Sequence, residues 1–523
     1  MTRLASGPSR GARPLPEAVP GQFTPTPAPT DFGHGKARGR HATALGEGFG
    51  WTVGWSIIGT LLPGSGLLAA GRRATGLLVL GLALFTLSAL AVFSLLADPV
   101  RMALNFAVDS NKLLLAVAGI TLVGLLGVIL VLSTYSALRH LAAPSSGQRV
   151  LGALLATALV GVVALPTLKL SSYAMIQRDL LNSVFGASPR NADAARPDAA
   201  KADPWAGTPR VNVLLIGSDA GADRVGVRPD TTILASINTV TGDTVLFSLP
   251  RNLQHVPFVA GSPGAQAFPD GYWCPDQSCL LNAIWTWAEG NPRYYPKSRY
   301  PDPGLSATED AVEGVTGLKV DYYAMLNLRG FSAFVDAIGG ITVNVTERLP
   351  IGGSVENPHP TGFIEPGKNQ HLDGYRALWF ARSRLFTDDY DRMRRQRCVI
   401  GAIVSQAQPA KVAEAFPRLA SAAKANISTD IPQADLSAWV DLSLRVKKGG
   451  SVRSLTFTPS VIGTTVNPNF SKIQELVQES LKPPPKPTPA PSASASAGAS
   501  PAPKPSATPS ANPTAAQDVS AVC

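Results

Sequence analysis

Two groups of charged residues, about 150 residues apart in the chain, have the composition of a phosphate-binding site. Forked guanidinium groups of arginine match phosphate oxygens, and carboxylates hold hard divalent cations. The two groups together therefore predict a site for a pyrophosphate with a divalent metal ion. Their members are Asp219, Arg228, Asp230, Arg251, Arg382, Arg384 and Gln396.

Asp219 and Asp230 are the candidate metal ligands. Asp219 follows the apolar run at 211–216, at the C-terminal end of a predicted strand, where α/β sheets bind ligands. Asp230 begins the next predicted strand. A metal ion held by both carboxylates would bridge diphosphate oxygens and help to orient an acceptor hydroxyl. The alternative for each carboxylate is a simple ion pair with an arginine.

Arg382 and Arg384 are predicted to lie on a strand, on the same face as Leu378 and Phe380. Residues two apart in a strand project to one side, so both guanidinium groups would point together. That arrangement is unfavourable unless an anion lies between them, as a diphosphate would. The alternative, a solvated edge strand, fits poorly because Trp379 and Phe380 give the segment a buried character.

A helix is predicted at 390–407, with residues suitable for capping at 387–389 and four arginines near its start. Asp391 and Arg395 are predicted to form an ordinary i,i+4 surface pair. Arg394 is a further candidate for binding the phosphates.

Three uncharged stretches, residues 74–96, 113–135 and 150–168, are each long enough to cross a membrane. Residues 51–70 are also apolar, but Pro63-Gly64-Ser65-Gly66 interrupts them. This stretch is predicted to be a hairpin or interfacial helix, with a fourth crossing as the alternative. A membrane location also indicates that the phosphate belongs to a lipid.

Basic residues flank the apolar stretches unevenly. Arg72, Arg73 and Arg139 have no acidic neighbours, whereas Asp98 and Asp109 lie in the loop between the first two spans. The positive-inside rule then places the arginines in the cytoplasm and everything after residue 170 outside.

The net charge of +10 is concentrated in the N-terminal part of the chain. Residues 1–210 hold 18 Lys/Arg against 9 Asp/Glu, which leaves a net charge of only +1 for the remaining residues. The basic charge thus belongs to membrane flanks and gives no support for nucleic-acid binding.

The remaining chain is predicted to form one exported α/β domain with a largely buried sheet, in which strands alternate with helices. A disordered cytoplasmic tail at 1–50 precedes the membrane region at 51–170. A linker at 171–208 then leads to the domain at 209–480, and a disordered Pro/Ala/Ser-rich tail at 481–523 follows. Strands are predicted at 211–216, 231–237, 243–248 and 341–345, and helices at 305–316, 330–338 and 390–407.

Four cysteines are too few for a disulfide scaffold. Cys274 and Cys279 enclose a short turn with proline, and in an exported domain this spacing predicts a local disulfide, with zinc as the rival. Cys398 is interpreted as a buried small apolar residue rather than a reactive thiol. Cys523, at the end of the tail, receives no role.

Residues 210 to about 408 resemble the LytR-CpsA-Psr (LCP) proteins of Gram-positive envelopes. The segments that carry the resemblance are residues 212–219 (NVLLIGSD), 228–231 (RPDT), 249–251 (LPR), 331–340 (FSAFVDAIGG) and 377–396 (ALWFARSRLFTDDYDRMRRQ). The resemblance implies an α/β/α domain with a mixed central sheet. It also implies that the helix around Phe331 and Phe334 helps to line an apolar cavity for a polyprenyl tail, and that Gln396 lies at the phosphates.

The same resemblance implies an enzyme that moves a glycopolymer from a polyprenyl-pyrophosphate carrier onto peptidoglycan, usually a muramic-acid 6-hydroxyl, forming a phosphodiester with Mg²⁺ or Mn²⁺. Pro229 stands where the family usually has serine, and Asn252 replaces a common acidic residue, which puts the support of Arg251 in question. A pyrophosphatase acting on the same lipid and a non-catalytic wall-binding or regulatory protein are the alternatives.

Overall fold

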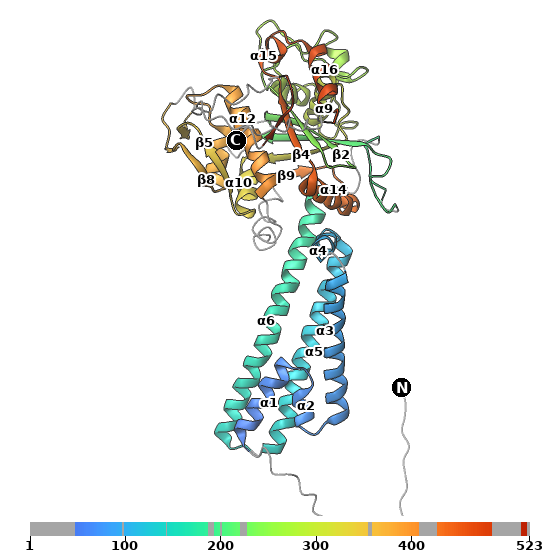
Figure 1. Cartoon of the computed structure of the whole chain (residues 1–523), viewed down its shortest axis with the longest axis vertical. Coiled ribbons are helices and arrows are strands. Elements are labelled where there is room, and N and C mark those ends of the chain that lie inside the picture. Colours follow the sequence, from blue (N-terminus) through green and yellow to red (C-terminus); the bar gives the residue numbers. More distant parts are fainter. Residues whose placement is uncertain are drawn as a thin grey trace, which may run out of the picture.

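The computed structural model describes residues 48–96, 99–142, 144–186, 193–198, 201–219, 227–353, 358–406, 426–483 and 514–519. A bundle of long helices carries a globular α/β domain at one end (Figure 1). The bundle contains α1 (Phe49–Leu61), α2 (Ser65–Ala69), α3 (Arg73–Leu96), α4 (Pro99–Ala107), α5 (Ser110–Ala142) and α6 (Ser146–Val184).

Three helices of the described residues are long and apolar enough to cross a membrane, and they coincide with the three predicted stretches. They are Arg73–Leu95, Ser110–Leu141 and Ser146–Val184. Small residues let α5 and α6 approach closely, since a Cβ built on Gly127 would lie 2.8 Å from Val163. The predicted break in 51–70 is also present: α1 ends at Leu61, and Gly64, with a φ of 94°, starts α2.

The predicted linker at 171–208 is wrong in two respects. First, α6 continues without interruption to Val184, well past the apolar run. Second, the segment after it packs on the domain, because Trp205 is 1% exposed and its Nε1 donates a 2.9 Å hydrogen bond to the carbonyl of Ala438. An Ala/Asp/Pro-rich composition predicted nothing to pack, but one tryptophan supplies a large apolar surface.

Within the described residues, the domain is built on a seven-stranded mixed sheet, and the mixed pairing is what the family resemblance implies. The strand order is β11-β10-β3-β2-β1-β4-β9. β1 pairs antiparallel with β2 and parallel with β4, and β3 pairs parallel with β10. The strands are β1 (Arg210–Ser218), β2 (Pro229–Asn238), β3 (Thr244–Leu249), β4 (Tyr322–Asn327), β9 (Ile427–Thr429), β10 (Val452–Thr456) and β11 (Gln517–Asp518).

The largest core cluster joins β1–β3 and β10 to the segments at 253–315 and to α16. Helices from several parts of the domain cover the sheet. These helices are α7 (Pro263–Ala267), α8 (Ile284–Glu289), α9 (Pro303–Thr316), α14 (Leu436–Gly449), α15 (Pro459–Ile462) and α16 (Phe470–Ser480), with short 3-10 turns at Leu281–Ala283 and Gln433–Asp435.

A second core cluster lies beside the sheet and holds α10 (Leu328–Ala337), α11 (Gly374–Arg382) and α12 (Asp389–Gln406) together. The predicted strand at 341–345 is β5 (Ile341–Val345), but it pairs with β8 (Gly367–Leu372) in a separate small sheet rather than joining the central one. A third sheet pairs β6 (Leu349–Ile351) with β7 (Gly362–Ile364).

Residues 514–519 pack on the domain, which the predicted disordered tail did not anticipate; residues 484–513 and 520–523 of that tail lie outside the described residues. β11 pairs with β10 through Arg453 and Ser454, and Val519 is 5% exposed. A Cβ built on Gly401 of α12 would lie 3.0 Å from Val519. Cys398, on the same helix, is 2% exposed as predicted, but it is disulfide-bonded rather than a free small apolar residue.

Peptide mapping under non-reducing conditions is expected to find two disulfides. Cys274 and Cys279 are bonded to each other, with Cα atoms 5.5 Å apart, which confirms the predicted local disulfide. Cys398 is also disulfide-bonded, and Cys523 lies outside the described residues. Recovery of Cys398 as a free thiol, or linked to Cys274, would contradict this pairing.

Candidate active site

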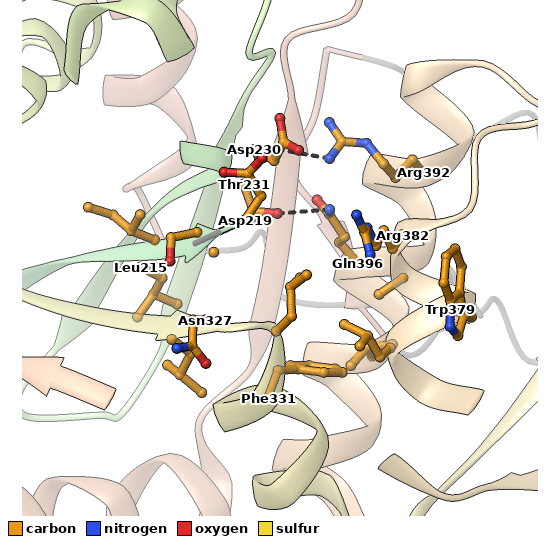
Figure 2. Close-up of a pocket in the computed structure, with 18 of the residues that line it drawn as sticks. Leu215, Asp219, Asp230, Thr231, Asn327, Phe331, Trp379, Arg382, Arg392 and Gln396 are labelled. Atoms are coloured by element: carbon orange, nitrogen blue, oxygen red, sulfur yellow. Dashed lines mark hydrogen bonds between the residues drawn. The ribbon is translucent and has the colours of Figure 1, made fainter. Parts of the chain in front are cut away.

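A cavity of about 860 Å³ lies between the ends of β1, β2 and β4 on one side and α10, α11 and α12 on the other (Figure 2). It brings together the two charged groups that the sequence separates by about 150 residues. All seven residues of the predicted set line it: Asp219, Arg228, Asp230, Arg251, Arg382, Arg384 and Gln396.

The cavity has a charged part and an apolar part. The apolar part is lined from β1, β2, β4 and β9 and from the helices facing them, and Phe331 and Phe334 of α10 take part, as the family resemblance implies. A site of this kind suits a ligand with an anionic head and a hydrocarbon chain. The apolar lining includes Leu215, Ile233, Ala324, Phe331, Phe334, Leu378, Trp379, Val399, Ile400, Ile403 and Ile427.

Two aspartates hold the arginines of the charged part in place. Asp230 accepts a 2.6 Å hydrogen bond from Nη1 of Arg251. Asp389 lies 3.0 Å from Arg392, 3.5 Å from Arg251 and 3.9 Å from Arg384. Three arginines thus share two carboxylates, so the cluster keeps an excess of positive charge for an anion.

Burial on its own raises the pKa of Asp230, but the charge and hydrogen bond of Arg251, with the charges of Arg392 and Arg384, outweigh it. The pKa of Asp230 is therefore held below its usual value, and the carboxylate stays ionised at neutral pH. Burial also lowers the pKa of Arg384, as do the neighbouring charges of Arg251 and Arg392. An anionic ligand among these arginines would relieve their repulsion.

α11 corrects the prediction of a strand that carries Arg382 and Arg384. Residues 374–382 are helical, and the side chain of Asp373 caps the helix by accepting a hydrogen bond from the backbone N–H of Arg376 at 2.8 Å. Arg382 is the last residue of α11, with its guanidinium 5.2 Å from the ring centre of Trp379. Arg384 follows in the turn after the helix, and both arginines still line the cavity.

Arg392 is a site residue that the sequence reasoning missed. It is 3% exposed and donates a 2.8 Å hydrogen bond to the backbone carbonyl of Asp230. Gln396, one helical turn later, donates a 2.8 Å hydrogen bond to the hydroxyl of Thr231. The spacing of Arg392 and Gln396, at i and i+4, places them on one helix face, and this signal was present in the sequence.

Arg394 does not line the cavity, in contrast to the prediction. It lies 3.8 Å from Asp391 and 4.0 Å from Glu347. The predicted surface pair of Asp391 with Arg395 is also wrong, because Arg395 is 2% exposed. Its guanidinium donates instead to the carbonyls of Phe380 and Ser383, to Thr387 and to Glu347, and so ties α12 to the end of α11.

Asn252 does not leave Arg251 without support. The amide of Asn252 donates to the hydroxyl of Thr465 at 3.4 Å, away from the arginine. Asp230 and Asp389 supply the carboxylates that hold Arg251 instead. Asp389 of α12 therefore gives Arg251 support that does not depend on an acidic residue at position 252.

Asp219 and Asp230 lie at neighbouring strand ends and line the same cavity, since Ser218 pairs with Pro229. Among the described residues, no three His, Cys, Asp or Glu side chains group together as a ready metal site. Two carboxylates fit the way Mg²⁺ binds at phosphate sites, where substrate oxygens and waters complete the coordination. The backbone N–H of Arg228 donates to Asp219 at 3.2 Å and fixes one carboxylate oxygen.

Comparison with known proteins gives one family and several relatives. The model of the LytR_cpsA_psr family matches residues 186–482. The polyisoprenyl-teichoic acid–peptidoglycan teichoic acid transferase TagU of Enterococcus faecalis is 30% identical over 230 residues, or 43% of this chain and 63% of that protein. The probable cell wall biosynthesis protein LcpB of Corynebacterium glutamicum is 30% identical over 227 residues, or 40% of this chain and 45% of that protein. The chain thus spans about half to two thirds of these relatives.

Solved structures also match. TagT bound to LIIa-WTA is 19% identical, with a TM-score of 0.38, over 56% of this chain and 97% of that one. The family protein YwtF (TagT) with bound octaprenyl pyrophosphate lipid is 19% identical, with a TM-score of 0.33, over 56% of this chain and 95% of that one. The family match covers more than half of the chain and contains the whole cavity, so the chain belongs to the LytR_cpsA_psr (LytR-CpsA-Psr) family.

Proposed function

We propose that this protein is a membrane-anchored phosphotransferase that moves a glycopolymer from a polyprenyl-pyrophosphate carrier onto peptidoglycan, forming a phosphodiester. The observation that carries the proposal is a single cavity that joins an arginine-rich part to an apolar part. TagU is named as a transferase of this type, and the YwtF structure holds an octaprenyl pyrophosphate lipid. Family membership and cavity chemistry therefore support the same reaction.

In this reaction, an acceptor hydroxyl oxygen attacks the phosphorus that carries the glycopolymer. A new P–O bond forms, and the bond from that phosphorus to the bridging diphosphate oxygen breaks, so that polyprenyl phosphate leaves. Arg251, Arg384 and Arg392, held by Asp230 and Asp389, would stabilise the charge that develops on the phosphate oxygens. The proton of the acceptor hydroxyl passes to solvent or to a nearby carboxylate. Asp230 is a poor proton acceptor, because its pKa is held below the usual value.

The test is transfer by the full-length protein in lipid vesicles, with a labelled polyprenyl-pyrophosphate glycopolymer and peptidoglycan as acceptor. Label should appear in peptidoglycan, and polyprenyl phosphate should accumulate in equal amount. Release of soluble glycopolymer phosphate and polyprenyl phosphate without need of an acceptor would favour the pyrophosphatase. Binding of the lipid with neither outcome would favour a non-catalytic role.

Asp219 and Asp230 are proposed to hold Mg²⁺ or Mn²⁺, which when bound would offset the charge of the diphosphate. Asp219→Asn and Asp230→Asn are each expected to raise the metal concentration needed for half-maximal transfer by roughly tenfold, since one charged ligand is lost. For Asp219→Asn, lipid affinity measured in a chelator should change much less, whereas Asp230→Asn also removes the carboxylate that pairs with Arg251 and should lower lipid affinity as well. Transfer by the wild-type protein that is unaffected by chelation would contradict the metal role.

The cavity domain is proposed to lie outside the cell, with Arg72, Arg73 and Arg139 inside. α1 has 13 residues, or about 20 Å at 1.5 Å per residue, which is short for the hydrocarbon core and favours the hairpin over a fourth crossing. Asp109→Cys is expected to react with an impermeant thiol reagent in intact cells, and Arg139→Cys only after permeabilisation. No cysteine among the described residues is free, so the background should be low. The reverse pattern would contradict this topology.

A further inference from the structure

The apolar part of the cavity reaches the top of the membrane helix α6. Ile427, the first residue of β9, lines the cavity and packs against Leu180 near the end of α6, as does Val184. A β-bridge between Gly186 and Pro432 fixes the chain just beyond this contact. Figure 1 shows α6 rising unbroken from the bundle to the underside of the domain, near β9. The cavity wall and the membrane helix therefore share one apolar contact.

One face of α6 continues this apolar surface toward the membrane. Tyr173, Ile176, Leu180 and Val184 follow at intervals of three and four residues, so they form one stripe along the helix, named here the α6 stripe. Tyr173 is 51% exposed and Ile176 is 37% exposed, although both lie above the apolar run that ends at residue 168. Leu180 lies eleven positions after Lys169, a rise of about 16 Å along the helix.

Packing against the neighbouring membrane helix does not explain the stripe. α6 faces α5 through Thr167, which lies against Gly124, and through Ser171, which lies 3.4 Å from Thr121. Ser171 and Ile176 are five positions apart, so their side chains point roughly 140° apart at about 100° per residue. The exposed stripe therefore looks away from the α5 contact and leads from the bilayer level to Ile427.

We propose that the α6 stripe is the path along which the isoprenoid chain of a membrane-embedded substrate passes between the bilayer and the cavity. This inference rests on the proposed function. A hydrocarbon chain that rises from the bilayer to the domain would otherwise expose its apolar surface to water, which is unfavourable in proportion to the exposed area. The stripe is continuous with the cavity at Leu180 and Ile427, and its apolar character suits a polyprenyl chain rather than a polar partner.

The test compares Ile176→Asp with Met175→Asp in the full-length protein. Met175 is 44% exposed and is the adjacent residue, about 100° around the helix, so it is a matched control off the stripe. Each variant is assayed with a long-chain polyprenyl-pyrophosphate glycan in phosphatidylcholine vesicles, and with a short-chain, water-soluble analogue carrying the same glycan. Ile176→Asp should reduce transfer from the vesicle substrate by roughly tenfold, because a charge on the path opposes the hydrocarbon chain. It should leave the short-chain reaction unchanged, and Met175→Asp should match the wild type with both.

Equal activity of Ile176→Asp and wild type on the vesicle substrate would overturn the path, and so would equal loss on both substrates. A second measurement separates this inference from the proposed function. A photo-crosslinking residue at position 176 should label polyprenyl phosphate in vesicles severalfold more than one at position 175, whether or not transfer occurs. Equal labelling overturns the path. Absence of transfer by wild type from either substrate contradicts the proposed function, while the crosslinking result still decides the path.

Discussion

The double variant Arg382→Ala/Arg384→Ala is expected to lose at least about a hundredfold in transfer. Both side chains line the charged part of the cavity. Hydrogen bonds to charged groups contribute on the order of 1.5 to 3 kcal/mol, so each single alanine variant should lower lipid affinity roughly ten- to hundredfold. Lysine should restore little, because a single ammonium cannot reproduce the guanidinium fork.

The measurements are polyprenyl-pyrophosphate binding and transfer by the full-length protein in vesicles. Arg376→Ala is the matched control, because Arg376 is an exposed arginine on the same helix that does not line the cavity. It should retain wild-type activity. Wild-type binding and transfer by the double variant would show that these arginines do not clamp a diphosphate.

Arg392→Ala is expected to have the second largest effect, although the family segments alone did not single it out. The side chain is 3% exposed, and its loss removes the 2.8 Å hydrogen bond to the carbonyl of Asp230 and the ion pair with Asp389. Removing one partner of a buried pair costs about 3 to 5 kcal/mol, and the partial exposure of Asp389 favours the lower end. Transfer should fall roughly ten- to hundredfold, with Arg384 and Arg251 less firmly positioned.

Arg394→Ala provides the control for Arg392, two residues away on α12 but outside the cavity. Its weak contacts with Asp391 and Glu347 are partly exposed, so its removal should change transfer less than twofold. The assay is transfer in vesicles, accompanied by thermal unfolding of both variants. Equal losses in the two variants would mean that the face of α12 toward β2 has no special role.

Local patterns were enough to identify much of the sheet edge. The apolar run of β1 followed by Asp219, and Asp230 at the start of β2, depend on residues adjacent in the chain. The three long apolar helices follow from length and composition, which the bilayer thickness sets. The close disulfide of Cys274 with Cys279 follows from a five-residue separation.

Other features depended on deciding whether a segment is a helix or a strand, and which face of a helix points toward the cavity. Alternating residues at 378–384 favoured a strand, but the cap at Asp373 starts a helix that ends at Arg382. The choice of Arg394 over Arg392 was an error of phase on a helix whose position was otherwise well predicted. Both signals are in the sequence, but the period-two pattern outweighs only the first of them, the helix at 374–382.

By itself, the sequence determined which residue types form the proposed phosphate site, on which strand ends the carboxylates lie, and that long apolar helices precede the domain. Only the tertiary structure decided that Asp389 holds Arg251, that Arg395 is buried, and that Cys398 is disulfide-bonded. The physical reason is that these outcomes depend on contacts between segments far apart in the chain. Residue order fixes local conformation, but packing of α12 against the sheet fixes which charges meet.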